Sequence, residues 1–123
     1  MKDPRGFQEF FEAFARHDPR GSAYTLRGFQ AERPPLFDFE AEIRRVATPA
    51  LIIVGDEDDP CLEPSLFLKA WLPASGLAVF PKAGHTVNLE EPALFNETLE
   101  RFLALIEAGR WGSRDPRSLR VFP

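Results

Sequence analysis

Two residues of this sequence, Asp58 and His85, are of the types that carry out acid–base catalysis together. A carboxylate that accepts a hydrogen bond from the Nδ1–H of a histidine selects the tautomer in which Nε2 can accept a proton, and it stabilises the resulting imidazolium. Asp58 and His85 stand 27 positions apart, which leaves room for one helix and one strand between them. They are therefore the candidate catalytic residues, provided that the fold brings them together.

Each candidate residue follows a segment with the pattern of a strand. The run 50–54, Ala-Leu-Ile-Ile-Val, is apolar at every position and is bounded by a proline and a glycine. This pattern is typical of a strand that is covered on both faces in a parallel sheet. A second short strand is predicted at 77–80. Because the carboxyl ends of neighbouring parallel strands meet at one edge of a sheet, the loops that carry Asp58 and His85 are expected to lie side by side.

Helical patterns account for most of the remaining chain. Apolar residues recur at helical spacing in several segments, and proline or glycine follows most of them. The predicted helices are 7–16, 22–32 with Ser22 as its N-cap, 36–46, 64–71, and 92–108 with Gly109 as its C-cap. The first helix places four aromatic side chains on one face, Phe7, Phe10, Phe11 and Phe14. The last segment, 110–123, contains Trp111 and is predicted to be a solvated, partly ordered tail.

The order of three helices, strand, helix, strand and helix predicts the α/β fold class. The strands near 50–54 and 77–81 should form a short parallel sheet with flanking helices, and the connection between them should be a right-handed crossover. The chain is thus expected to consist of a helical part at 1–46, a β-α-β-α part at 47–109 and a C-terminal tail at 110–123.

The segments around both candidate residues resemble those of the α/β-hydrolase family. The segment 49–58, Pro-Ala-Leu-Ile-Ile-Val-Gly-Asp-Glu-Asp, is similar to the family's acid-bearing segment, with a proline before the strand and G-x-x-D after it. The segment 80–96 is similar to the family's catalytic-histidine segment, in which Gly84 precedes His85 and Glu-Glu-Pro opens the final helix. The resemblance extends over about 36–107.

This resemblance implies a partial α/β-hydrolase fold, in which 1–109 is the C-terminal part of the domain. The helical part at 1–46 would be the end of the cap region and the helix that leads into the acid-bearing strand. The resemblance implies that Asp58 is the acid and His85 the base of a Ser-His-Asp triad. It also implies hydrolysis of small-molecule esters, lactones or similar carbon-centred substrates, for which we expect no cofactor.

The third member of such a triad is missing from its expected place. In the family the serine lies N-terminal to the acid, on a G-x-S-x-G turn between a strand and a helix. Ser22 is the only serine before Asp58, and no predicted strand precedes it. We therefore expect no serine-dependent hydrolysis by this chain alone. Two alternatives remain open, a non-catalytic dimerisation or binding module derived from a hydrolase and an unrelated small α/β protein.

Composition and charge disfavour several other classes of protein. The chain has 19 acidic and 15 basic residues and a net charge of −4, which gives no basic surface for nucleic acid. The longest apolar run, 50–54, is too short to span a membrane, and the N-terminal residues carry no apolar signal-peptide pattern. These features predict a cytoplasmic protein with neither a nucleic-acid partner nor a membrane partner.

The other reactive side chains are interpreted as structural. Cys61 is the single cysteine, which precludes an intrachain disulfide and a cysteine-based zinc site, and we expect it to be a packed loop residue rather than a nucleophile. Asp56, Glu57 and Asp59 are expected to be solvated, although Asp56 could cap its loop, and no second ligand cluster supports a metal site. His17 is expected at the surface, at the end of a helix.

A free strand edge and an apolar helix predict association with another chain. The strand at 50–54 can pair with the strand at 77–80 on one side only, and an open edge presents unpaired N–H and C=O groups. Three arrangements would cover this surface: a homodimer, a complex with the N-terminal, serine-bearing half of a hydrolase, or the first three helices folded back over the gap. We favour the homodimer. The homodimer would use the open edge and the aromatic face of the helix at 7–16.

Overall fold

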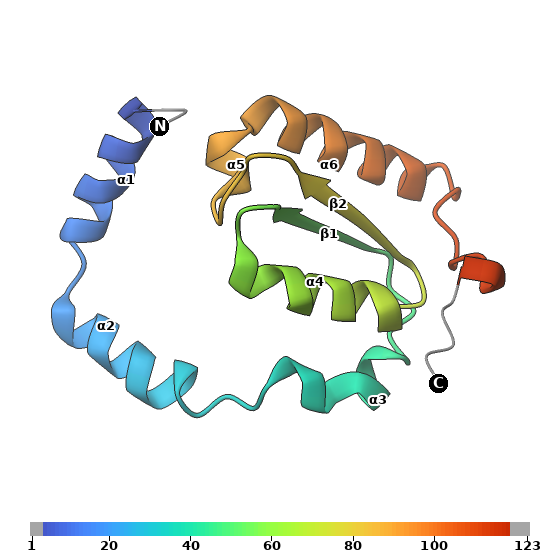
Figure 1. Ribbon diagram of the computed structural model, residues 1–123, viewed down its shortest axis with the longest axis horizontal. Helices are drawn as coiled ribbons and strands as arrows, with labels where there is room; N and C mark the ends of the chain where they lie inside the picture. The colour runs from blue at the N-terminus through green and yellow to red at the C-terminus, as the bar shows by residue number, and fades with distance from the viewer. Residues whose placement is uncertain (1–3, 119–123) are drawn as a thin grey trace. The chain divides into compact units, whose positions relative to one another are not determined.

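The computed structural model describes residues 4–118. Residues 1–3 and 119–123, the ends of the predicted helical part and of the predicted tail, lie outside the described residues. The chain forms two compact units, residues 1–38 and 39–123, and each is described by itself. Figure 1 shows the order of the helices and strands along the chain.

The first unit contains two α-helices. The first, α1, spans Pro4–Ala15, and the second, α2, spans Pro19–Thr25. A π-helical turn at Leu26–Gln30 continues α2, and the amide of Ala31 closes it with a 2.9 Å hydrogen bond to the carbonyl of Leu26. The predicted helix at 22–32 is therefore part of a longer helical segment with a π-helical end.

Ser22 lies inside α2 and is not its N-cap, so this prediction was wrong. Asp18 is the N-cap, and its Oδ1 accepts a hydrogen bond of 2.9 Å from the amide of Arg20. Pro19 was taken to end the preceding helix only, but it occupies the first position of α2. Proline fits there because the amides of the first helical turn have no partner within the helix.

The aromatic face predicted for the first helix is present on α1. The four side chains of this phenylalanine face, Phe7, Phe10, Phe11 and Phe14, are between 51% and 61% exposed. Phe7 stacks on Phe11 with ring centroids 6.4 Å apart, and Phe10 stacks on Phe14 at 6.1 Å. No residue of α1 is buried, so the phenylalanine face is open to solvent.

The predicted helix at 36–46 is divided into two shorter elements. A 3-10 turn spans Leu36–Phe39, and α3 spans Glu40–Ile43. The division falls at Phe39, whose φ of −99° and ψ of 19° depart from α-helical geometry. Ile43 is the buried residue of α3 and is 8% exposed.

The second unit contains the predicted parallel sheet. Strand β1 spans Ala50–Gly55 and strand β2 spans Ser75–Phe80. The two strands pair in parallel along their whole length, from Ala50 opposite Ser75 to Gly55 opposite Phe80. The predicted parallel pairing is confirmed, and β2 begins two residues earlier than predicted because Gly76 is accommodated within the strand. The fold is therefore a mixed α/β arrangement with a two-stranded sheet in the described residues.

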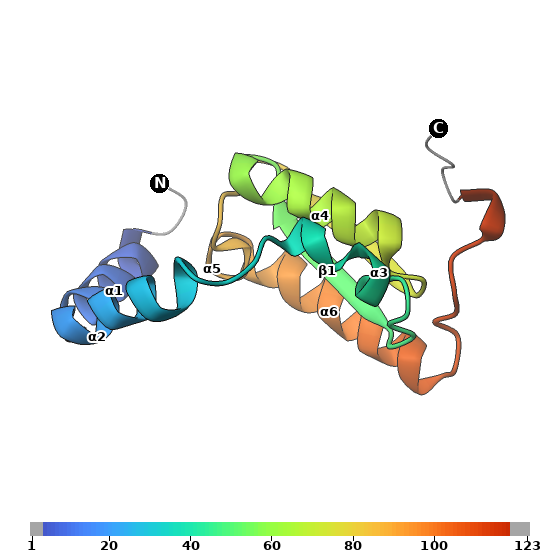
Figure 2. The ribbon, with the colours of Figure 1, turned by 90° about the horizontal axis from the view of Figure 1, so that it is seen from below.

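Helices lie on both sides of this sheet. The crossover helix, α4, spans Asp59–Trp71, and the last helix, α6, spans Pro92–Glu107. Figures 1 and 2 show the two strands between α4 and α6. A short helix, α5, at Val87–Glu90 precedes α6 and was not predicted. A four-residue helix is too short for apolar periodicity to reveal it.

α4 begins earlier than the predicted helix at 64–71. Pro64 was expected to open the helix but lies in its second turn. There it forfeits the hydrogen bond that its amide would donate to the carbonyl of Pro60. Pro60 stands in the first turn, where a missing N–H costs little. The two prolines are thus accommodated at the start of α4 without ending it.

The end of α6 follows the sequence prediction. Gly109 has a φ of +64°, the left-handed conformation that glycine adopts without steric cost. Its amide donates to the carbonyl of Ile106 at 2.9 Å, and the amide of Arg110 donates to the carbonyl of Leu105 at 2.8 Å. These two bonds form a Schellman motif, which satisfies carbonyls that the helix itself leaves unpaired.

The core of the second unit gathers beside the carboxyl ends of the strands. One cluster of buried residues there consists of Phe80, Ala83 and Val87, which are 3%, 0% and 8% exposed. Ile53, Ala78 and Phe95 pack against them while remaining partly exposed. This buried cluster includes Ala83, which belongs to the same loop as His85.

The segment after α6 is packed more closely than predicted. Trp111 donates a hydrogen bond of 2.8 Å from Nε1 to the carbonyl of Ala74, and its ring meets the edge of Phe102 with centroids 4.7 Å apart. Gly76 leaves the space for this indole, because a Cβ at that position would lie 2.5 Å from the ring. The amide of Arg114 donates to the carbonyl of Pro73 at 2.8 Å. Trp111 and Arg114 are thus packed against the second unit, whereas the other described positions at 110–117 are exposed.

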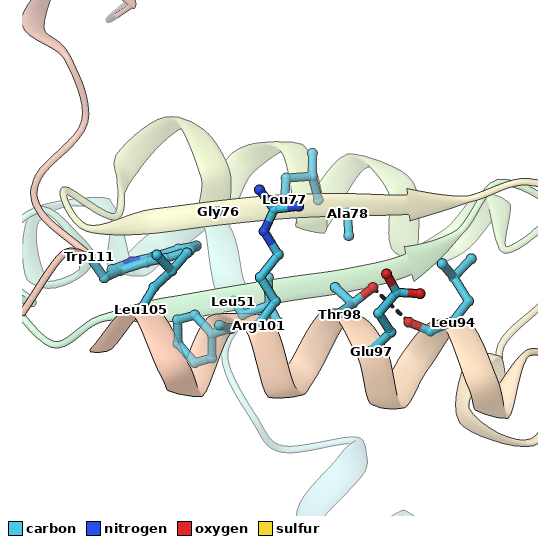
Figure 3. A pocket seen from close by; sticks show the side chains of 11 residues that line it. Leu51, Gly76, Leu77, Ala78, Leu94, Glu97, Thr98, Arg101, Leu105 and Trp111 are labelled. Carbon is cyan, nitrogen blue, oxygen red and sulfur yellow. Dashed lines mark hydrogen bonds between the residues drawn. The ribbon is translucent and has the colours of Figure 1, made fainter. Parts of the chain in front are cut away.

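A groove of about 350 Å³ lies between the sheet and α6 (Figure 3). Leu51 and Gly76, near the amino ends of the two strands, line it together with Trp111. The loops that bear Asp58 and His85 follow the carboxyl ends of the same strands, so this groove does not contain the candidate catalytic pair. No helix among the described residues has the length and apolar character needed to cross a membrane.

Candidate active site

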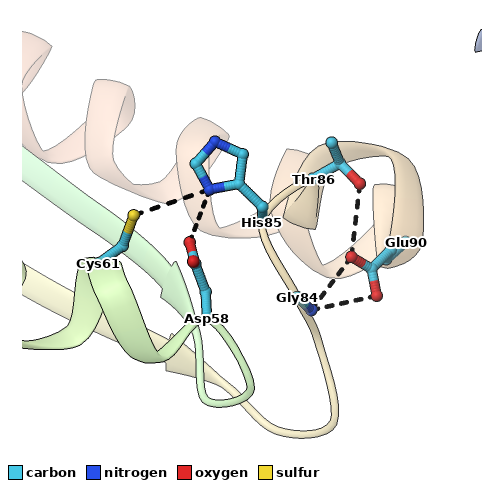
Figure 4. Close-up of polar contacts among 6 residues, drawn as sticks. All are labelled: Asp58, Cys61, Gly84, His85, Thr86 and Glu90. Carbon is cyan, nitrogen blue, oxygen red and sulfur yellow. Dashed lines mark hydrogen bonds and ion pairs between the residues drawn. The ribbon is translucent and has the colours of Figure 1, made fainter. Parts of the chain in front are cut away.

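Asp58 and His85 form a direct hydrogen bond at the carboxyl edge of the sheet. Oδ2 of Asp58 lies 2.8 Å from Nδ1 of His85, and Figure 4 shows the second ring nitrogen on the far side of the imidazole. The side chain of Asp58 is only 11% exposed, whereas that of His85 is 78% exposed. The pair therefore has a sheltered carboxylate that holds an accessible imidazole. The contact itself agrees with the prediction that the two loops lie at the same edge of the sheet.

Gly55 allows the two loops to approach each other. It is the last residue of β1, and a Cβ at this position would lie 2.0 Å from the carbonyl oxygen of Ala83 and 2.5 Å from that of Gly84. Real Cβ atoms do not approach backbone atoms so closely, so no larger residue fits here without displacing the loop that carries His85. The glycine of the G-x-x-D segment thus has a steric role in forming the pair.

Backbone hydrogen bonds join the two loops. The amide of Asp56 donates to the carbonyl of Phe80, and the amide of Glu57 donates to the carbonyl of Ala83, both at 3.0 Å. The Asp56 carboxylate accepts a bond of 2.6 Å from the amide of Lys82, which has a φ of +58°. Asp56 therefore caps the loop after β2 rather than its own loop. Glu57 is exposed, as expected, and pairs with the ammonium group of Lys82 at 3.0 Å.

Glu90 supports the histidine loop from the other side. Both of its carboxylate oxygens lie 3.1 Å from the amide of Gly84, the residue before His85. Thr86 donates a longer bond of 3.4 Å to the same carboxylate. This role of Glu90 was not predicted, because it depends on α5, which places Glu90 back against Gly84. A threonine followed closely by a glutamate was the available signal of a helix start.

Asp58 also stands at the N-cap position of α4, but its carboxylate makes no capping hydrogen bond. Its carbonyl accepts a bond of 2.9 Å from the amide of Cys61, which begins the helical turn. An aspartate at an N-cap usually satisfies one of the free amides of the first turn. Here the carboxylate is directed to His85 instead, so the local backbone stabilisation is replaced by a contact between distant parts of the chain.

Cys61 joins the pair, which the sequence analysis did not expect. It lies in the first turn of α4 rather than in a loop, and its Sγ is 3.7 Å from Nδ1 of His85. Asp58, Cys61 and His85 offer ligand atoms that all lie within 4.8 Å of one another. A single cysteine does not preclude a metal site with a cysteine ligand, because the fold brings a carboxylate and an imidazole next to the thiol.

The hydrogen bonds of this cluster change the acidity of its members. The Cys61 thiol and the His85 ring both bond to the Asp58 carboxylate and hold its pKa below the ordinary value of 3.8. The same bond to Asp58, together with burial, raises the pKa of the Cys61 thiol. Asp58 is thus the ionised member and Cys61 the protonated one. A Nδ1–H that donates to Asp58 leaves Nε2 as the ring nitrogen that can accept a proton.

The described serines do not complete a triad in the expected way. Ser22 lies inside α2 of the first unit, and Ser65 lies inside α4. Ser75 opens β2, is 6% exposed and donates its hydroxyl to the carbonyl of Leu72 at 2.9 Å. None of these three serines stands on a turn from a strand into a helix, where a nucleophile of the predicted type would be exposed.

The chain is similar to two curated proteins. Over 92 residues it is 32% identical to a protein of Bacillus subtilis (strain 168) provisionally named 2-succinyl-6-hydroxy-2,4-cyclohexadiene-1-carboxylate synthase, a match that covers 74% of this chain and 32% of that protein. Over 104 residues it is 36% identical to a protein of Agrobacterium fabrum (strain C58) provisionally named carbamate hydrolase RutD, a match that covers 77% of this chain and 38% of that protein. The chain thus spans roughly a third of the length of these relatives. No family model matches the chain, and no solved structure matches it significantly.

Proposed function

We propose that this chain is the C-terminal part of an α/β-hydrolase catalytic domain, in which Asp58 and His85 are the acid and the base of a Ser-His-Asp triad. The 2.8 Å hydrogen bond between Oδ2 of Asp58 and Nδ1 of His85 is the observation that carries the proposal. The position of both residues just after paired parallel strands supports it. The 36% identity to a protein named as a hydrolase is further support.

The proposed substrates are small-molecule esters or similar carbon-centred compounds. Nε2 of His85 would take the proton of a serine hydroxyl as that oxygen attacks the substrate carbonyl, and it would later return the proton to the leaving group. Asp58 would hold the ring orientation and stabilise the imidazolium. This role needs an ionised carboxylate, and the lowered pKa of Asp58 fits that need.

The serine would come from the part of the domain that precedes this segment in a longer protein, or from a separate chain. The 78% exposure of His85 leaves its ring accessible to such a part. β1 pairs with β2 on one side, and its other edge would be the place for the next strand of a larger sheet. The serine-bearing part would thus cover both the imidazole and the free edge.

Complementation tests the proposal. The DNA upstream of the Met1 codon is first read for a segment that encodes G-x-S-x-G. That segment, or otherwise the segment of the Agrobacterium relative that precedes its region of similarity, is co-expressed with the full chain, and hydrolysis of p-nitrophenyl acetate is measured on the purified complex. We expect turnover that His85→Ala abolishes and that Asp58→Asn lowers by up to about 10⁴-fold.

Glu57→Gln is the matched control, because Glu57 lies in the same loop but pairs with Lys82 and not with His85. We expect this variant to retain the turnover of the unaltered complex. A folded complex without turnover would contradict the proposal, and so would turnover that survives His85→Ala.

A non-catalytic dimerisation or binding module is the second candidate function. The phenylalanine face on α1 favours it, because four neighbouring aromatic side chains that are more than half exposed are costly to leave in water. In this case the chain would associate through this face without a serine-bearing part. Association that leaves the Asp58–His85 pair unused would distinguish this function from hydrolysis.

A further inference from the structure

Three side chains with different ligand atoms converge at the carboxyl edge of the sheet. Asp58 comes from the loop after β1, Cys61 from the first turn of α4 and His85 from the loop after β2 (Figure 4). One oxygen, one sulfur and one nitrogen lie within 4.8 Å of one another. Asp58 and Cys61 are partly buried, whereas His85 is exposed, so the cluster is open to solvent on the side of the imidazole.

The distances within the cluster fit a tetrahedral metal ion. Zn–S bonds of about 2.3 Å and Zn–N bonds of about 2.0–2.1 Å place the two ligand atoms about 3.6 Å apart at a tetrahedral angle. The Sγ of Cys61 and Nδ1 of His85 are 3.7 Å apart. Oδ2 of Asp58 is nearer to Nδ1, at 2.8 Å, because a proton joins these atoms. A metal would need them about 3.3 Å apart, a small displacement for an imidazole that is 78% exposed.

We propose that Asp58, Cys61 and His85 bind one divalent cation of the zinc class, with a fourth position open to water. A thiolate, an imidazole and a carboxylate together suit zinc and similar borderline ions. Mg²⁺ and Ca²⁺ prefer sites made entirely of oxygen ligands, so this ligand set should discriminate against them. The proposal does not depend on the proposed hydrolase function, because it needs no serine and no substrate.

Proton and charge balance are simple in this site. On binding, Cys61 releases its thiol proton to solvent, because the thiolate is the ligand. His85 stays neutral and its proton moves from Nδ1 to Nε2, so that Nδ1 can donate its lone pair to the metal. Asp58 is already ionised. One carboxylate and one thiolate then balance the two positive charges of the cation.

The position of Cys61 favours a ligand over a nucleophile. A cysteine that a histidine activates is deprotonated by the free ring nitrogen and has a lowered pKa. Here Sγ lies near Nδ1, the nitrogen that already donates to Asp58.

Metal binding would exclude the triad role of the same histidine. The metal occupies Nδ1 and leaves the ring proton on Nε2, which then cannot take a proton from a serine. Zinc would therefore inhibit the proposed hydrolase activity reversibly, and removal of the ion would restore that activity. Cys61 would be the residue that adds this control, since a triad of the proposed kind has no role for it.

Cobalt(II) is the probe for the proposed site. The purified full chain is titrated with Co²⁺, and we expect one equivalent to produce a thiolate-to-cobalt charge-transfer band in the near ultraviolet together with the intense visible bands of a tetrahedral ion. Zn²⁺ should remove these bands by displacement, and Mg²⁺ should not. Cys61→Ser should lose the charge-transfer band, and His85→Gln should weaken Co²⁺ binding by at least about tenfold.

His17→Gln is the matched control, because it removes the other histidine of the chain, which lies in the first unit. It should leave the titration unchanged, and far-ultraviolet circular dichroism should show that all variants are folded. Absence of the charge-transfer band in the folded unaltered chain would overturn the proposal. The proposal would also be overturned if the bands persisted in His85→Gln or were lost in His17→Gln. These spectra require no turnover, so their failure is separate from a failure of the hydrolase proposal.

Discussion

The last residue of β1, Gly55, lies so close to Ala83 that a Cβ on the glycine would be 2.0 Å from the alanine carbonyl oxygen. Ala83 is fully buried and forms part of the core of the second unit. The amide of Glu57 also donates to the Ala83 carbonyl. This contact fixes the distance between the two loops, and with it the distance between Asp58 and His85.

We expect Gly55→Ala to displace the histidine loop and to destabilise the second unit. The added methyl group would meet backbone atoms that cannot rotate away, and overpacking of this kind typically costs about 1–3 kcal/mol. Urea denaturation measures the loss, and the imidazole resonances of His85 report whether the contact with Asp58 persists. Gly112→Ala is the control, because a Cβ there has no neighbour within 4 Å. Equal stability of the two variants would show that the loops are not held by this contact.

The Asp58–His85 contact should make stability depend on pH at the acidic end. The folded state holds the pKa of Asp58 below its ordinary value of 3.8, mainly through hydrogen bonds from Cys61 and His85. Its contribution to stability is therefore present above pH 3.8 and is lost as the pH falls through the folded-state pKa. Urea midpoints of the unaltered chain and of Asp58→Asn should differ at pH 6 and converge once the pH falls below the lowered folded-state pKa of Asp58. Glu100→Gln, which changes an exposed carboxylate, is the control. If the difference in urea midpoint between the unaltered chain and Asp58→Asn grew as the pH fell, Asp58 would not be the source of the pH dependence.

Trp111 should contribute substantially to the stability of the second unit. Trp111→Ala removes the edge contact with Phe102 and the bond to the Ala74 carbonyl. Because the side chain is only partly buried, we expect a loss of about 2 kcal/mol, below the range of about 3–5 kcal/mol for fully buried aromatic residues. Trp111→Phe keeps an aromatic ring and loses the N–H donor, and should cost about 1 kcal/mol. Equilibrium denaturation would measure both, and an unchanged midpoint for Trp111→Ala would show that the segment after α6 is not anchored.

The isolated chain should show no serine-dependent ester hydrolysis. Among the described residues no serine stands on a strand-to-helix turn, and Ser22 lies inside α2. Assays with p-nitrophenyl esters should therefore give the same slow rate for the unaltered chain, Ser22→Ala and His85→Ala. Substantial turnover that both substitutions abolish would identify Ser22 as an unexpected nucleophile and would remove the need for a serine-bearing partner.

The phenylalanine face should mediate association, and we propose a homodimer in the absence of a serine-bearing partner. Phe10 and Phe14 of this face stack on each other and are 51% and 61% exposed. Phe10→Glu with Phe14→Glu should convert the dimer to a monomer in sedimentation experiments, because charge is not tolerated in an apolar contact. Gln8→Glu adds charge to the same helix outside the face and should leave the dimer intact. A monomer at high micromolar concentration for the unaltered chain would rule this arrangement out.

Sequence patterns alone predicted the features that depend on neighbouring residues, and one distant contact that follows from the order of the strands. The continuous apolar run at 50–54 predicted a strand, because a segment without polar positions needs cover on both faces. Gly109 predicted the end of α6, because a left-handed residue at that place favours glycine. The placement of Asp58 and His85 after successive strands predicted that they would meet, and their 2.8 Å contact agrees with it. Their catalytic roles stay predictions.

Tertiary structure decided the other contacts between segments far apart in the chain. Cys61 reaches Nδ1 of His85 across 24 residues, and Trp111 reaches the Ala74 carbonyl across 37. No local or periodic sequence pattern predicts either contact. Each depends on how a helix or the C-terminal segment packs against the paired strands. Periodicity reports which side of an element is apolar, but the identity of the neighbour on that side is set by the crossover and the packing of the whole unit. For this reason the sequence revealed the acid and the histidine, whereas the third side chain beside them appeared only in the folded chain.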